Sequence, residues 1–189
     1  MKNYIDIYLK ETEKIINSID RDSINSFIKC IDLLREEKGR LFICGVGGSA
    51  ANASHAVNDF RKILGIESYA PTDNVSELTA RVNDESWEDS YVNWLKVSDL
   101  TSRDCVMIFS VGGGSENTSQ NLVRCMEYAK ERESSVISIV SRDGGYAKEV
   151  SDACILIPVV SQERITPHAE GWQGILWHMV VTCLGEHYG

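Results

Sequence analysis

Positively charged side chains are scarce in this sequence. Its 189 residues contain 19 lysines and arginines against 28 aspartates and glutamates, which gives a formal net charge of -9. Nucleic acids and anionic membranes are bound mainly through basic surfaces. We therefore expect neither a general nucleic-acid binder nor a membrane binder. The charge does not exclude a phosphorylated ligand, because a few backbone N–H groups can hold one phosphate locally.

Long apolar runs are also missing. None approaches the roughly 20 residues that a membrane-spanning helix needs, and the N-terminal stretch MKNYIDIYLKETEK lacks the apolar centre of a secretion signal. Six cysteines occur without any C-x-x-C pair, and Cys44, Cys105 and Cys154 lie inside apolar runs. We expect buried, reduced thiols in a soluble cytoplasmic protein. A zinc–cysteine site or disulfides are the alternatives.

Five short apolar segments are typical of strands that are buried on both faces, as in a parallel sheet. These segments are 41–45, 66–70, 105–111, 135–140 and 153–159. Segments with helical periodicity follow them, at 49–64, 75–98 with a break near Asn83, 117–132, 145–151 and 167–186. This alternation predicts an α/β fold, a three-layer αβα sandwich built from right-handed βαβ units around a five-stranded parallel sheet.

The first part of the chain is different, because residues 3–37 show helical spacing without an intervening strand. A length of 189 residues suits one domain with a sizeable core. We expect a single domain over 1–189, in which 1–37 is an N-terminal helical extension.

Two glycine–serine loops follow predicted strands. The loop G-V-G-G-S occupies 45–49, and S-V-G-G-G-S occupies 110–115. Ligands of open α/β sheets bind at the carboxyl ends of the strands, and we expect each loop to open a helix whose N-terminus attracts anions. The alternative is that both loops are only tight turns. The candidate phosphate-binding residues are Gly47, Gly48, Ser49, Ser110, Gly112, Gly113 and Ser115.

The first loop also satisfies the loose dinucleotide pattern G-x-G-x-x-A, with Glu67 as a candidate ribose-binding acid. That pattern is weak on its own. The repetition of the glycine–serine device in the second loop argues against it, as do His55 and Asp59 on the following helix. The P-loop pattern G-x-x-x-x-G-K-[ST] does not occur.

A histidine and carboxylate set forms the second candidate site. His55 and Asp59 are one turn apart and point away from the apolar stripe of their helix. Glu170 and His178 are eight residues apart on the C-terminal helix, hence on neighbouring azimuths. Together these four could hold a divalent metal such as zinc. They could equally serve as acid and base without a metal, and a solvated surface pair is the alternative for His55 and Asp59.

With these motifs identified, the chain resembles the sugar isomerase (SIS) domain proteins, and within them the bacterial sedoheptulose 7-phosphate isomerases, also called phosphoheptose isomerases. The resemblance covers nearly the whole chain. It is carried by GGSAANASH at 47–55, TARVND at 79–84, RDGG at 142–145 and the C-terminal helix with His178. It implies a flavodoxin-like sheet with strand order 2-1-3-4-5 and a homotetramer with active sites at the subunit junctions.

The resemblance also assigns site residues. It implies phosphate contacts for Ser49, Ser110 and Ser115, and a place near the sugar for Asn83 and Asp84. The remaining family positions match His55, Asp59 in place of a glutamate, Glu170 in place of a glutamine, and His178. The sequence departs from the family at Val46, where an asparagine is usual, and at S-V-G-G-G-S, where S-T-S-G-N-S is usual. Phosphate binding would then rest more on backbone N–H groups.

The implied activity is aldose–ketose isomerisation of sedoheptulose 7-phosphate to D-glycero-D-manno-heptose 7-phosphate, for nucleotide-activated heptose and bacterial surface polysaccharide synthesis. Asp59 and His178 would be the acid–base pair. A divalent ion, zinc in our expectation, would be held by His55, Asp59, Glu170 and His178. The alternative is a non-catalytic SIS-domain adaptor or a sugar-phosphate sensor. The joint presence of these four residues favours the enzyme.

Overall fold

The computed structural model describes residues 2–188, and its centre is one sheet of five parallel strands in the order β2-β1-β3-β4-β5. The order places the first two strands beside each other and adds the later ones on one side only. This confirms the predicted α/β sandwich and its 2-1-3-4-5 topology. The strands are β1 (Leu41–Gly45), β2 (Ser68–Tyr69), β3 (Cys105–Phe109), β4 (Ser135–Val140) and β5 (Ala153–Leu156).

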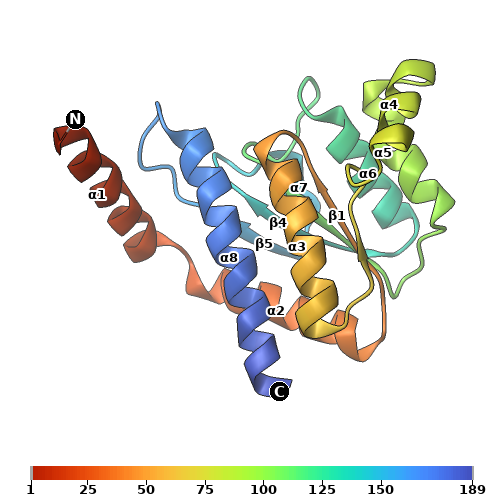
Figure 1. Cartoon of the computed structure of the whole chain (residues 1–189), viewed down its shortest axis with the longest axis horizontal. Helices are drawn as coiled ribbons and strands as arrows, with labels where there is room; N and C mark the ends of the chain where they lie inside the picture. Colours follow the sequence, from red (N-terminus) through yellow and green to blue (C-terminus); the bar gives the residue numbers. More distant parts are fainter. Residues whose placement is uncertain (1, 189) are drawn as a thin grey trace.

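Helices cover both faces of this sheet (Figure 1). One face packs against α2, α3 and α8, and the other against α5, α6 and α7. The helices are α1 (Lys2–Ser18), α2 (Arg21–Glu36), α3 (Gly48–Leu64), α4 (Val75–Asp84), α5 (Trp87–Val97), α6 (Gln120–Glu131), α7 (Gly145–Val150) and α8 (Ile165–Tyr188).

The central strand β1 shows why the apolar runs do not alternate with polar residues. Leu41 and Ile43 belong to the core under α2, α3 and α8, whereas Phe42 and Cys44 belong to the core on the opposite face. All four are 0% exposed. Successive side chains of a strand point to opposite faces, so a strand covered on both sides has to be apolar throughout.

The predicted N-terminal helical segment is two helices. Asp20 lies between the two helices and caps α2, because its carboxylate accepts a hydrogen bond from the Asp22 amide. The helix α1 extends away from the sheet (Figure 1). It is tied to the start of α8 by Glu11, whose carboxylate accepts hydrogen bonds from both Arg164 and His168. The expectation of a single domain over 1–189, with 1–37 as an extension, stays a prediction.

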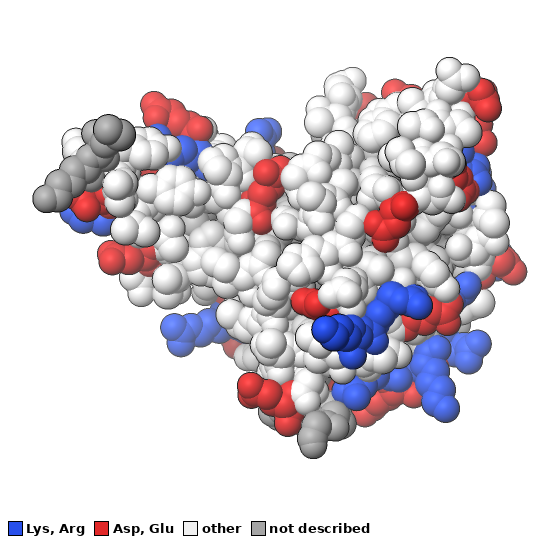
Figure 2. All heavy atoms as spheres, in the orientation of Figure 1, with Lys and Arg blue, Asp and Glu red and all other residues white. Residues whose placement is uncertain are grey.

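Several boundaries differ from those predicted. β2 is limited to Ser68–Tyr69, and β3 and β5 end earlier than the apolar runs do. The helix α6 begins at Gln120, so the expectation that the second glycine–serine loop leads directly into a helix is wrong. Within residues 2–188, no helix combines the length and apolarity needed to cross a membrane. Figure 2 shows that the broad middle of one molecular face carries few charged side chains.

Candidate active site

A cleft of about 1030 Å³ opens where β1, β3 and β4 end. It is lined by predicted phosphate-site residues from both loops, namely Ser49, Ser110, Gly112 and Ser115. The cleft therefore lies at the carboxyl edge of the sheet, where parallel α/β folds bind their ligands. Gly47, Gly48 and Gly113 neighbour these residues in the chain but are not among those that line the cleft.

The second loop is held by its own hydrogen bonds. The Gly113 amide donates to Oγ of Ser110 over 3.0 Å, and the carbonyls of Gly113 and Gly114 accept from the first amides of α7. Gly113 has φ +74°, and a Cβ there would collide with the backbone of Gly144. Glycine is therefore required at Gly113 by the close approach of the two loops.

The first loop meets α8 at an unexpected point. A Cβ added to Gly48, the first residue of α3, would collide with the carboxylate of Glu170. The amide of Asn52, one turn later, donates to the Glu170 carbonyl over 2.9 Å and to Oε1 of Gln173 over 3.0 Å. A carboxylate is favourable at this end of a helix, because it faces the positive end of the helix dipole.

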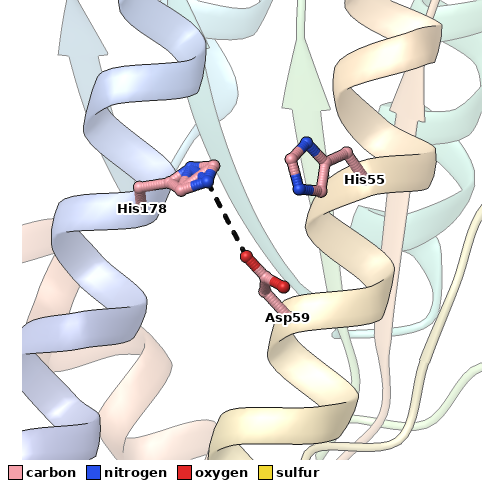
Figure 3. A group of neighbouring side chains, drawn as sticks. All are labelled: His55, Asp59 and His178. Atoms are coloured by element: carbon pink, nitrogen blue, oxygen red, sulfur yellow. Dashed lines mark ion pairs between the residues drawn. The ribbon is translucent and has the colours of Figure 1, made fainter.

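The helices α3 and α8 run in the same direction, as their successive contacts show. The start of α3 meets Glu170, and its far end meets Gly185, where a Cβ would lie 3.0 Å from Ile63. Between these points, His178 of α8 faces His55 and Asp59 of α3 (Figure 3). This parallel packing brings two sets of residues together that are far apart in the sequence.

His55, Asp59 and His178 form a compact cluster. One nitrogen or oxygen of each lies within 4.8 Å of the others, which is a spacing that a metal ion could bridge. Nε2 of His178 lies 3.8 Å from Oδ2 of Asp59, longer than a direct hydrogen bond. The other oxygen, Oδ1, accepts from the side-chain amide of Asn58 over 2.7 Å. Asn58 therefore fixes the carboxylate so that Oδ2 faces His178.

Trp177 lies beneath both histidines. Its ring centroid is 4.7 Å from that of His55 and 3.5 Å from that of His178, and its side chain is 1% exposed. Nδ1 of His178 lies 3.1 Å from the carbonyl of Gly174. A carbonyl only accepts, so this bond places the proton on Nδ1 and leaves the lone pair on Nε2. Histidines that bind metals are oriented by such a second hydrogen bond.

Three of the predicted site residues do not join these groups within one chain. Glu170 was expected to complete the cluster of His55, Asp59 and His178, but its carboxylate lies at Gly48 instead. Asn83 and Asp84 end α4, hydrogen-bond to each other over 2.7 Å and do not line the cleft. Their place near a sugar stays a prediction.

Several residues of the cleft were missed by sequence reasoning, Ser119 and Arg142 among them. Ser119 stands immediately before α6, with left-handed backbone (φ +54°), and it lines the cleft. Arg142 follows β4, also has φ +54°, and lines the cleft as well. The sequence signal for Arg142 was present in the R-D-G-G segment, which directly follows a predicted strand. Ser119 could have been found only by recognising that the loop extends four residues beyond Ser115.

The structure does not support the dinucleotide interpretation, because Glu67, the candidate ribose-binding acid, lies away from the glycine loops. Glu67 stands before β2, and its carbonyl accepts from the amide of Leu41 at the start of β1. Its carboxylate accepts from the Tyr69 hydroxyl over 2.7 Å. Glu67 therefore lies at the amino edge of the sheet, opposite the glycine loops.

Comparisons with known proteins identify the family of this chain. The SIS domain family model matches residues 4–141. A phosphoheptose isomerase of Nitratiruptor is 30% identical over 184 residues, covering 95% of this chain and 93% of its own. One from Helicobacter pylori (strain ATCC 700392 / 26695) is 26% identical and covers 96% and 93%. The solved phosphoheptose isomerase from Neisseria gonorrhoeae superposes with a TM-score of 0.81 at 21% identity, over 97% of this chain and 96% of its own. The chain belongs to the SIS domain family and, within it, to the phosphoheptose isomerases.

Proposed function

We propose that this protein is an aldose–ketose isomerase that converts sedoheptulose 7-phosphate to D-glycero-D-manno-heptose 7-phosphate. The observation that carries the proposal is that His55, Asp59 and His178 lie close together on α3 and α8, and that both helices begin at the cleft. Membership of the phosphoheptose isomerases supports the choice of substrate. The product would supply nucleotide-activated heptose for bacterial surface polysaccharides.

The reaction needs one group that takes a proton and one that returns it. A proton leaves carbon 1, and its electron pair forms the C1–C2 double bond of an enediolate. The proton is then delivered to carbon 2, the hydroxyl proton of O1 passes to O2, and O1 becomes the aldehyde oxygen. Asp59 and His178 are the acid–base pair, because a carboxylate oxygen and an imidazole nitrogen face each other across 3.8 Å. Asn58 and Gly174 hold the two groups in orientation.

The cluster also fits a divalent metal ion, and we propose zinc. Two imidazoles and a carboxylate are typical zinc ligands, and three protein ligands with an open position are typical of a catalytic site. His55, Asp59 and His178 would hold the ion, and Glu170 would join them only if its side chain left Gly48. Nε2 of His178 cannot bind the ion and exchange a proton at once, so during turnover His55 and Asp59 would hold the ion while His178 acts as acid or base. When bound, such an ion polarises a carbonyl and stabilises enediolate oxygens.

The cleft would hold the other end of the sugar. Ser49 lines the cleft, and His55 and Asp59 lie six and ten residues later on α3. At about 1.5 Å rise per residue, these spacings correspond to about 9 and 15 Å. An extended seven-carbon sugar phosphate spans such a distance. The phosphate contacts proposed here are Ser49, Ser110, Gly112 and Ser115, with Gly47, Gly48 and Gly113 shaping the loops.

A homo-oligomer, most simply a tetramer, would complete the site. Ile5 and Leu9 of α1 are 57% and 58% exposed, and an apolar groove of about 560 Å³ lies between the α1–α2 region and α8. Burial of such surface is the usual basis of stable association. Asn83 and Asp84 would approach the sugar of a neighbouring subunit. Light scattering on purified protein tests this, since an active monomer contradicts it.

The proposed location is the cytoplasm. All six cysteines are free, and Cys44 and Cys125 are 0% exposed. Unpaired thiols of this kind are typical of proteins in reducing compartments.

Formation of the aldoheptose phosphate from sedoheptulose 7-phosphate, followed by NMR with and without a chelator, tests the reaction and its metal separately. Turnover that stops with chelator and resumes with zinc supports both. Turnover that persists supports the acid–base pair without the metal. A protein that binds the sugar phosphate without turnover is the adaptor or sensor instead.

A further inference from the structure

The cleft contains one positively charged side chain. Of the described residues that line it, only Arg142 and Asp143 carry charge. Asp143 directs Oδ1 to the amide of Gly145 over 3.2 Å, within its own turn. Arg142 is exposed, and no ion pair or hydrogen bond of its guanidinium occurs within residues 2–188. A guanidinium without a partner is thus available at the anion-binding edge of an acidic protein.

The backbone holds Arg142 in a conformation that non-glycine residues rarely adopt. Its φ is +54°, in the left-handed region, which costs of order 1–3 kcal/mol for such residues. The neighbouring residue fixes it, because the Ser141 amide donates to the Val111 carbonyl and the Gly144 amide donates to the Ser141 carbonyl. The Arg142 side chain consequently lies along the second loop, with Cδ 3.8 Å from where a Cβ of Gly112 would be.

The other groups at this edge that could bind an anion are partly used by contacts within the protein. The Gly113 amide is used by Ser110, and the Ser115 amide donates to the Thr118 carbonyl. The start of α3 already faces the carboxylate of Glu170. A phosphate dianion placed here would therefore have few backbone donors and a nearby negative charge. It would need a cation, and the structure offers Arg142.

We propose that Arg142 binds the substrate phosphate directly and supplies its principal charge partner. A guanidinium binds phosphate oxygens with two parallel N–H donors, which fixes orientation as well as charge. The inference rests on the proposed function for the identity of the sugar. The guanidinium and the glycine–serine loops that line the cleft fit a phosphate monoester.

Substitution of Arg142 by glycine tests the role of the side chain without disturbing the backbone conformation. Arg142→Gly removes the guanidinium and leaves a residue that accepts φ +54° without strain, so the fold is retained. Arg142→Lys keeps the positive charge but loses the two parallel N–H donors of the guanidinium. Arg103→Gly is the control, because Arg103 is also exposed but precedes β3, at the opposite edge of the sheet. Circular dichroism and thermal unfolding check the fold of each variant.

The first measurement is calorimetric binding of inorganic phosphate to chelator-treated protein. We expect the dissociation constant to rise at least tenfold in Arg142→Gly, to rise less in Arg142→Lys, and to stay within twofold in Arg103→Gly. A change below twofold in Arg142→Gly overturns the proposal, as does wild-type protein that binds no phosphate.

The second measurement is steady-state turnover of sedoheptulose 7-phosphate. For Arg142→Gly we expect KM to rise at least tenfold and kcat to stay within threefold, since the guanidinium lies far from the reacting carbons. A fall in kcat with constant KM contradicts phosphate binding by Arg142. Wild-type protein that binds phosphate through Arg142 but does not turn over this sugar contradicts the proposed reaction and leaves the present inference standing.

Discussion

The carboxylate of Glu170 lies directly against Gly48, the first residue of α3. The spacing of Glu170 and His178 suggested that both face one site. The eight residues between them correspond to about 12 Å along the helix, however, so in the parallel pair of helices His178 lies beside His55 and Asp59 while Glu170 lies at the start of α3. There it occupies the place that a bound anion would favour.

Replacing Glu170 by glutamine should strengthen phosphate binding. The substitution removes a negative charge from the helix terminus, whose interaction with charge is worth about 0.3–1 kcal/mol. We expect inorganic phosphate to bind metal-free Glu170→Gln about two- to fivefold more tightly than wild type, as measured by calorimetry. Glu163→Gln is a matched control, because Glu163 is exposed on the approach to α8. Equal affinities for wild type and Glu170→Gln would show that this carboxylate does not compete with the ligand.

Trp177 should control the metal affinity of the cluster without contacting the ion. Its indole packs against both His55 and His178, and groups that orient metal ligands typically change affinity by 10–100-fold when replaced. We predict that Trp177→Phe weakens zinc binding by about tenfold in a competition titration. Trp172→Phe makes the same change five residues earlier on α8 and should bind zinc as wild type does. Wild-type affinity in both variants would leave Trp177 with a packing role alone.

The contacts of Glu11 that attach α1 to α8 should stabilise the fold less as the pH falls below about 5. Hydrogen bonds from Arg164 and then His168 lower the pKa of Glu11 from 4.5 to about 2. A carboxylate with a lowered pKa stabilises the fold above its unfolded pKa and loses that contribution as pH falls through the folded value. The Tm difference between wild type and Glu11→Gln should therefore be constant above about pH 5 and shrink from pH 4.5 toward pH 2. A difference that stays constant over this range would be incompatible with a pKa near 2.

Much of the fold was predictable because the strands are buried on both faces. An unbroken apolar run such as 41–45 is stable in an α/β protein as a central strand that is covered on both faces. The strand β1 has the predicted bounds. Strand ends were less predictable, since β2 lies at the edge of the sheet and pairs with β1 only over Ser68 and Tyr69. The apolar residue Ile66 beside it is buried by packing under α3 rather than by pairing in the sheet.

The candidate site was predictable in part. The turn spacing of His55 and Asp59 follows from helical geometry, and their approach to His178 required only that α3 and α8 pack in parallel. The position of Glu170 depends on how α3 and α8 are aligned along their axes, and that of Arg142 on a left-handed backbone; a residue pattern specifies neither. Ser119 depends on the path of a loop that continues past Ser115 before α6 begins.

The most direct test of the account is kcat for conversion of sedoheptulose 7-phosphate by Asp59→Asn and His178→Ala, beside wild type and the exposed α3 control Lys62→Ala. Loss of a general acid or base typically costs 10²–10⁴-fold. We predict a fall of at least about 100-fold in each site variant, with Tm and phosphate affinity near those of wild type, and unchanged turnover in Lys62→Ala. A folded His178→Ala or Asp59→Asn protein that keeps wild-type kcat would contradict the assignment of this pair to the chemistry.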